Sequence, residues 1–136
     1  MTESGRSRIE ERISAEAKGL RVVEVSDLLD DNKLQVIKRQ PGVLAVLAFY
    51  EGFPVKSIGN GDFEQVAAVA EDILRAGERT ANDMRMGTLD QIVLEAGEKK
   101  CIIAPHGDLA LCTITRADAN LGLVRLAIRQ LQRMKH

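Results

Sequence analysis

Few side chains in this sequence have types and spacings that could do chemistry, and His106 is the first of them. It lies in Pro105-His106-Gly107-Asp108, a run whose composition is typical of a hairpin turn. A catalytic histidine needs a nucleophile or a carboxylate beside it, and only Asp108 is near in the sequence. We therefore interpret His106 as a solvated turn residue and not as a general base.

The two cysteines, Cys101 and Cys112, are the next candidates for reactivity. With a two-residue turn at His106-Gly107, Cys101 would lie opposite Cys112 in a hydrogen-bonded pair, with Cα atoms ~5.5 Å apart. A disulfide would fit there, but two thiols in a reducing compartment are better interpreted as small buried apolar residues. Two cysteines and two histidines are also too few for a zinc site at any familiar spacing. The sequence therefore predicts no metal.

Motifs for nucleotide hydrolysis and covalent catalysis are missing from the sequence. The run SIGNGDFE holds two glycines, but no Lys-Ser or Lys-Thr follows, so it is not a phosphate-binding loop. Neither Gly-x-Ser-x-Gly, His-Glu-x-x-His nor Cys-x-x-Cys occurs. We therefore predict a protein that is not an enzyme and holds no cofactor.

Composition narrows the partners as well. A net charge of −1 with 29% charged residues gives no overall attraction to nucleic acid or to an anionic membrane. Aromatic residues make up 3% of the chain, so the base-stacking platform of a single-strand binder is missing. No apolar run approaches the ~20 residues of a membrane span, and the polar start has no apolar signal core. The sequence predicts a cytoplasmic protein.

One basic feature is a candidate contact surface. Arg125, Arg129 and Arg133 recur every four residues along the last predicted helix, so they form one stripe on it. The stripe is either a partner contact or simply the solvated face of that helix.

Apolar periodicity predicts the elements that must position these residues. Residues 1–25 form either a short helix or a flexible extension, and one domain follows over 26–136. The pattern predicts an α/β fold with a single, roughly five-stranded, mostly antiparallel sheet and helices on both faces. The expected elements are a helix ending before Pro41-Gly42, strands 43–50 and 53–58, a helix over 62–85, strands 89–96, 99–105 and 109–115, and a helix over 118–131. Strand 43–50 is nearly all apolar and is expected to be buried on both faces, whereas Pro54 makes strand 53–58 an edge. Asp62, with Gln65, is expected to cap the long helix.

The long helix carries more apolar surface than one sheet requires. Its apolar members fill roughly 180° of the helical wheel, whereas a helix on one sheet needs a stripe only somewhat wider than ~100°. The excess is rich in Ala and Gly, which allow a second helix to approach closely, and strand 89–96 is expected at an unprotected edge. We therefore predict a homodimer. The expected interface residues are Ala67, Ala70, Leu74, Gly77, Ala81, Ile92, Val93 and Leu94.

Four residues are expected to serve structure and not chemistry. Gly42 and Gly52 provide backbone freedom at the ends of the first strand. Asn120 caps the N–H groups that open the last helix. Gly122 is expected to let the first turn of that helix pack tightly against the neighbouring strand.

Four stretches, taken in order, carry a family resemblance: PGVLAVLAFYEGFPVKS, the Ala-rich long helix, LDQIVLEA and DANLGLVRL. Over about residues 27–134 they resemble the Roadblock family of dynein light chains and MglB-like GTPase regulators. Family members carry Asp-Gly-Leu-Pro after the first strand, where this chain has Glu51 before the turn glycine. The resemblance implies a profilin-like sheet and a second chain paired strand to strand.

The resemblance also implies a function. Such a protein is a non-enzymatic homodimer that binds a small Ras-like GTPase, as a scaffold or as a GTPase-activating partner. Arg39 and Arg116 are loop-side candidates for an arginine finger, and nothing in the sequence favours either. The alternative is a small-molecule sensor of similar architecture. Against the sensor, the sequence reveals no cluster of inward polar or aromatic groups to fix a ligand.

Overall fold

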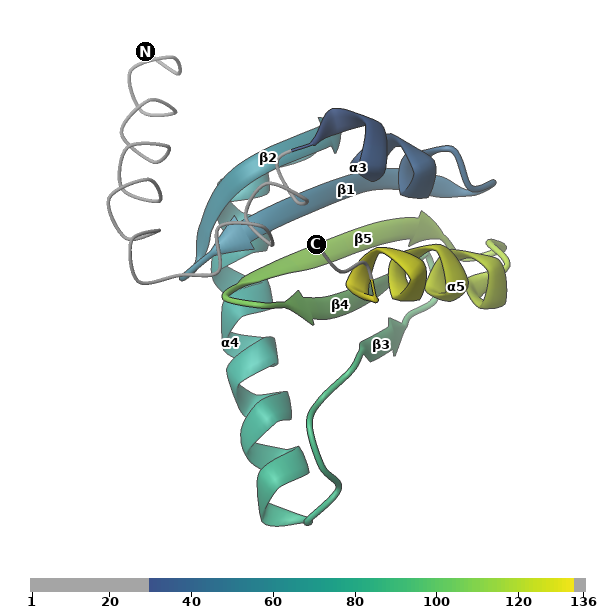
Figure 1. Cartoon of the computed structure of the whole chain (residues 1–136). Helices are drawn as coiled ribbons and strands as arrows, with labels where there is room; N and C mark the ends of the chain where they lie inside the picture. Colours follow the sequence, from purple (N-terminus) through teal and green to yellow (C-terminus); the bar gives the residue numbers. More distant parts are fainter. Residues whose placement is uncertain (1–29, 134–136) are drawn as a thin grey trace.

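The structure, a computed structural model, describes residues 30–133, and Figure 1 shows them as one sheet with helices packed on it. The predicted order of helix, two strands, long helix, three strands and helix is confirmed. The predicted extension 1–25 and residues 26–29 lie outside the described residues. The elements are α3 (Asp31–Lys38), β1 (Val43–Tyr50), β2 (Phe53–Gly59), α4 (Phe63–Asp83), β3 (Ile92–Glu95), β4 (Lys99–His106), β5 (Leu109–Arg116) and α5 (Leu121–Gln132).

The five strands form an antiparallel sheet in the order β2-β1-β5-β4-β3. Seven of the eight residues of β1 are buried, as its apolar run predicts for a strand covered on both faces. Strands β2 and β3 are the two edges, as predicted. Strand β3 is shorter than the predicted span 89–96, because the carbonyl of Asp90 accepts a hydrogen bond from Gln132 of α5 and not from a strand.

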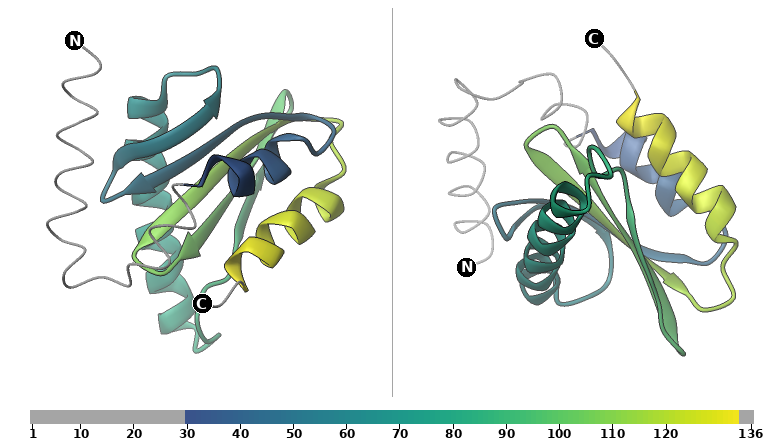
Figure 2. Two further views of the ribbon diagram at one scale, coloured as in Figure 1. Left: turned by 45° about the horizontal axis from the view of Figure 1, so that its top comes forward. Right: turned by 90° about the horizontal axis from the view of Figure 1, so that it is seen from below.

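Helices α3 and α5 cover one face of the sheet, and α4 lies on the other face (Figure 2, right view). Among the described residues, fifteen are buried in the cluster beneath α3 and α5, and three half-buried apolar residues pack against them. Only eight are buried in the cluster beneath α4, with seven half-buried apolar residues around them. The two faces are therefore covered to different extents.

Local sequence signals place the starts of the helices. The Asp62 carboxylate accepts a hydrogen bond from the backbone N–H of Gln65 at 3.3 Å, so it caps α4. The Asn120 side chain caps α5 in the same way, accepting from the N–H of Leu123 at 3.3 Å. Both caps are confirmed.

The turn between β1 and β2 needs a left-handed backbone at two successive residues. Glu51 has φ +48° and Gly52 has φ +82°, which is the pattern of the hairpin turn whose twist matches that of the strands. Gly52 tolerates this conformation readily, whereas Glu51 is a residue type that seldom adopts it.

Gly42 is required for two reasons. Its φ is +88°, and a Cβ added there would lie 2.7 Å from the Cβ of Ala119. Its carbonyl oxygen accepts a hydrogen bond from the N–H of Arg116 at 2.8 Å, which ties the start of β1 to the end of β5. Any side chain at this position would push these two segments apart.

Gly122 does not have the role predicted from the sequence. A Cβ added there would meet only the capping oxygen of Asn120, at 3.2 Å, and no atom of a neighbouring strand within 4 Å. Gly122 is exposed, so it does not provide a close approach to the sheet, and its nearest neighbour is the cap itself.

The predicted register of the last hairpin is wrong by one residue on each strand. His106 pairs with Leu109, so the turn residues are Gly107 and Asp108. His106 is the last residue of β4 and only 5% exposed, so it is a buried strand residue and not a solvated turn residue. The shift also means that Cys101 is not opposite Cys112.

Candidate functional site

The described residues contain no group of three or more His, Cys, Asp or Glu side chains placed to hold a metal ion. No helix in this part of the chain is long and apolar enough to cross a membrane. The features that remain are an incompletely covered sheet face and two clefts, and each is built from several elements.

Helix α4 covers only one end of its sheet face. In Figure 1 it crosses the strands near the β1–β2 and β4–β5 turns and leaves their other ends free on that side. Strands β4 and β5 have eight residues each, or ~26 Å at ~3.3 Å per residue, whereas a helix with its side chains is ~10–12 Å wide. One helix can therefore cover about half of this face.

The uncovered end is marked by one row of apolar side chains across the sheet. Leu94 of β3 pairs with Cys101 of β4, and Cys101 pairs with Ile114 of β5. Leu94 is 44% exposed, and the other two are half-buried. The flank of α4 that faces this end carries further apolar side chains. We call the whole surface the open seam; it consists of Val66, Val69, Ile73, Leu94, Cys101 and Ile114.

The structure places the predicted interface residues of α4 differently from the prediction. Ala67, Ala70, Leu74 and Ala81 are buried against the sheet of their own chain, so they are not open to a partner. The surplus apolar arc exists, but its residues Val66, Ile73 and Val69 lie about 70–130° around the helix from the direction of the buried residues. The helical wheel gave the width of the apolar arc on α4. Only the packing of α4 on the sheet determines which part of that arc is buried within the same chain.

Gly77 is a site of close approach, as expected, but its neighbour is a strand of the same chain and not a second helix. A Cβ added there would lie 2.5 Å from Cδ1 of Ile92 and 3.4 Å from Cδ2 of Leu89. Gly77 and Ile92 therefore join α4 to the start of the edge strand. Val93 packs on the opposite face, against the cluster beneath α3 and α5, and Leu94 remains in the open seam.

The basic stripe on α5 is divided by its contacts. The Arg125 guanidinium donates a hydrogen bond to Oε1 of Gln91 at 3.1 Å, beside the start of β3. Arg129 and Arg133 instead line a cleft. Of the two arginine-finger candidates, Arg116 pairs with Asp118 on the surface at 3.2 Å, and Arg39 is exposed just after α3. The structure brings neither of these two to a site.

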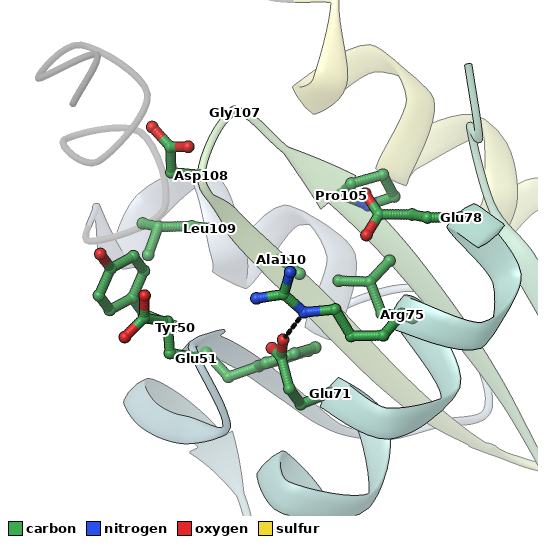
Figure 3. Close-up of a pocket in the computed structure, with 12 residues that line it drawn as sticks. Tyr50, Glu51, Glu71, Arg75, Glu78, Pro105, Gly107, Asp108, Leu109 and Ala110 are labelled. Atoms are coloured by element: carbon green, nitrogen blue, oxygen red, sulfur yellow. Dashed lines mark hydrogen bonds and ion pairs between the residues drawn. The ribbon is translucent and has the colours of Figure 1, made fainter. Parts of the chain in front are cut away.

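The first cleft lies between α4 and the two turns that point toward it (Figure 3). It has a volume of about 180 Å³. The Arg75 guanidinium extends into it and is held by the Glu71 carboxylate, whose hydrogen bond and negative charge raise the pKa of Arg75. Since Glu51, Glu78 and Asp108 also line it, this cleft is acidic around one paired cation.

The second cleft lies at the edge of the sheet between the loop after α4 and the end of α5, and its volume is about 360 Å³. We call it the Arg129 cleft. Gln132 lies in it and donates hydrogen bonds to the carbonyl oxygens of Asp90 at 2.9 Å and Pro105 at 2.8 Å. Sequence reasoning missed this cleft, because its charged residues and its histidine come from four separate segments, which are α4, the following loop, β4 and α5. The charged residues and the histidine that line it are Glu78, Asp90, His106, Arg129 and Arg133.

Cys101 and Cys112 are free thiols that meet diagonally across β4 and β5. Cys101 pairs with Ile114 and Cys112 with Ile103, so the two thiols lie on the same face. A hydrogen bond from the Cys112 thiol lowers the pKa of Cys101 from 9.0 to about 7, although burial opposes the shift. The same hydrogen bond, together with burial, raises the pKa of Cys112. Of the two thiols, Cys101 is therefore the one with the lowered pKa, and it lies in the open seam.

The fold and the open seam describe an α/β module without an evident catalytic centre among its described residues, and comparison with known proteins gives its family. The model of the Roadblock/LC7 domain matches residues 29–115. The chain belongs to the Roadblock/LC7 domain family.

Similar proteins agree with this assignment. The uncharacterized protein MJ0310 of Methanocaldococcus jannaschii is 38% identical over 72 residues, which are 53% of this chain and 63% of that protein. A Roadblock/LC7 domain from Streptomyces avermitilis has a TM-score of 0.70 at 15% identity, covering 76% of this chain and 92% of that one. The gliding protein MglB of Thermus thermophilus has a TM-score of 0.70 at 14% identity, covering 81% of this chain and 86% of that one. These two structures show a shared fold.

Proposed function

We propose that this chain is a homodimeric regulatory or scaffold module that binds a small Ras-like GTPase. The observation that carries the dimer is the open seam, an apolar surface that α4 of the same chain leaves uncovered. A second α4, laid beside the first, would bury it. The edge strand β3 of each copy would then pair with the other, which removes two exposed edges at once.

The support for the GTPase partner is of a different kind. It rests on membership of the Roadblock/LC7 family and on the resemblance to MglB-like regulators in the sequence motifs. The proposed contact is the stripe Arg125, Arg129 and Arg133 on α5, the helix that packs on the sheet face opposite to α4. The protein itself hydrolyses no nucleotide in this proposal, and its place is the cytoplasm, where such GTPases act.

The dimer is tested by adding charge to the open seam. Val69 is 45% exposed in the single chain, so V69E should leave the folded monomer intact while it places a carboxylate in the dimer interface. Light scattering of the wild-type chain should give about twice its 14.9 kDa, and V69E should give the monomer mass. The matched control is A68E, one residue earlier and 100° further around α4, which should remain dimeric. A monomeric wild-type chain at tens of micromolar would contradict the proposal.

The GTPase partner is tested by affinity capture from native lysate on the immobilised wild-type chain. The capture is done once with a non-hydrolysable GTP analogue and once with GDP, and the bound proteins are identified by mass spectrometry. A Ras-like GTPase enriched with the GTP analogue supports the proposal. If the chain is dimeric but retains no GTPase in either state, the GTPase part is wrong and the dimer stands.

A further inference from the structure

The Arg129 cleft has two walls of opposite charge. Arg129 and Arg133 come from the end of α5 and lie one helical turn apart, so both guanidinium groups are on the same side of that helix. Glu78 of α4 and Asp90 of the following loop line the cleft from the other elements. Two guanidinium groups and two carboxylates therefore line the same cleft from different elements, and their charges sum to zero.

These charges are not neutralised by one another. Within residues 30–133, Arg129, Arg133 and Asp90 make no ion pair and no side-chain hydrogen bond. The cleft between the walls has a volume of about 360 Å³, which is in the range of small-ligand sites, ~300–1,000 Å³. The opposite charges thus face a space large enough for a small solute.

The walls are fixed by hydrogen bonds that do not use these charges. Gln132 joins α5 to Asp90 and Pro105, and Gln91 donates to Oε1 of Gln132 at 3.2 Å and to the carbonyl oxygen of Arg125 at 3.3 Å. This network holds the loop after α4 against α5 and the end of β4. A ligand would therefore meet a site that is already formed, which reduces the entropy lost on binding.

We propose that the Arg129 cleft binds a small zwitterion of the amino-acid class. Its carboxylate would be held by Arg129 and Arg133, because a guanidinium group donates two parallel hydrogen bonds to a carboxylate. Its ammonium group would lie against Glu78 and Asp90. A simple anion would be repelled by the two carboxylates, and a simple cation would be repelled by the two guanidinium groups. A solute that carries both charges therefore fits best. Arg129 and Arg133 also belong to the proposed GTPase contact, but the zwitterion is tested on this chain alone, so either proposal can fail without the other.

The experiment compares a zwitterion with its two halves on the full-length wild-type chain. L-Alanine, sodium acetate and methylammonium chloride are each titrated at constant ionic strength into ¹⁵N-labelled protein, and the amide signals of Thr88 and Gly107 are followed. We expect saturable shifts with L-alanine, and dissociation constants at least about tenfold weaker for acetate and methylammonium. A Cβ added at Gly97 would meet no atom within 4 Å, so the amide signal of Gly97 serves as the unperturbed reference.

Two double variants test the two walls separately. R129Q/R133Q and E78Q/D90N should each weaken L-alanine binding by at least about tenfold, with unchanged melting temperatures. The matched control R79Q removes an arginine from the solvent side of α4 and should bind as the wild type does. Equal affinities for acetate and L-alanine, or no shift up to 100-fold molar excess over ~1 mM protein, would overturn the proposal.

Discussion

The two faces of the sheet are both apolar, but they are covered by different numbers of helices. Two helices, α3 and α5, bury one face, and among its apolar residues only three are left half-buried. A single helix, α4, lies across the other face and leaves seven half-buried. Since one helix spans about half the length of the strands, α4 covers only part of the second face. Within residues 30–133, one face of the sheet is therefore closed and the other is partly open.

The largest expected effect is on the closed face. Ile128 of α5 is fully buried, so I128A should lower the free energy of unfolding by about 2–5 kcal/mol. The change should not alter the dimer mass, because α5 is on the face opposite to the open seam. Urea unfolding followed by circular dichroism measures the loss. L126A on the same helix is the control, since Leu126 is 53% exposed; an equal loss there would show that α5 is placed incorrectly.

The next effect concerns the join between α4 and the edge strand. G77L would drive a side chain into Ile92, whose Cδ1 lies 2.5 Å from the position of a Cβ. We expect a loss of about 1–3 kcal/mol from overpacking, together with weaker dimerisation because β3 is displaced. R79L, on the solvent side of α4, should cost much less. Thermal melts measure the loss of stability and light scattering measures the dimer. Equal results for G77L and R79L would contradict the placement of Gly77 against Ile92.

A smaller effect distinguishes the two thiols. Because the pKa of Cys101 is lowered to about 7, its thiolate forms near neutral pH. Iodoacetamide should modify it roughly three- to sixfold faster at pH 7 than an equally exposed thiol of ordinary pKa, since the larger thiolate fraction outweighs the lower nucleophilicity. Its rate should rise through about pH 7 and then level off, whereas Cys112, whose pKa is raised, should stay unmodified in the folded protein.

C112A removes the hydrogen bond, so the Cys101 profile should shift toward higher pH in that variant. Peptide mass spectrometry after timed alkylation gives both rates. The reaction at Cys101 should also slow as protein concentration rises, since a partner would cover the open seam. A rate that does not depend on concentration, in a protein shown to dimerise, would place Cys101 outside the interface.

The smallest effect is on the N-terminal turn of α5. Gly122 is exposed and near only the Asn120 side chain, so G122A should stabilise the protein by up to about 1 kcal/mol through helix propensity. G42A is the contrast, because its φ of +88° and the contact with Ala119 make the same added methyl group destabilising. Differential scanning calorimetry of both variants measures the two effects. A loss of stability in G122A would instead show that the added methyl group displaces the capping oxygen of Asn120, its one near neighbour.

The sequence by itself determined the features that depend on neighbours along the chain. The apolar run of β1 predicted a strand buried on both faces, and Asp62 and Asn120 predicted the helix starts that they cap. Gly52 predicted the turn with positive φ. These signals are local, since a cap or a turn uses hydrogen bonds within a few residues. The order of the elements and the family resemblance follow from them.

Only the tertiary structure decided which surfaces remain free. The hairpin turn lies one residue later than predicted, which moved His106 into the core and put Cys101 and Cys112 two residues out of register. Moving a two-residue turn by one residue changes every pair along the two strands. The apolar arc of α4 was visible in the sequence, yet the sheet determined that Ala67 and Ala70 are covered and that Val69 is not. The Arg129 cleft joins α4, the following loop, the end of β4 and α5. Such a site has no sequence spacing of its own, since it exists only where distant segments pack together.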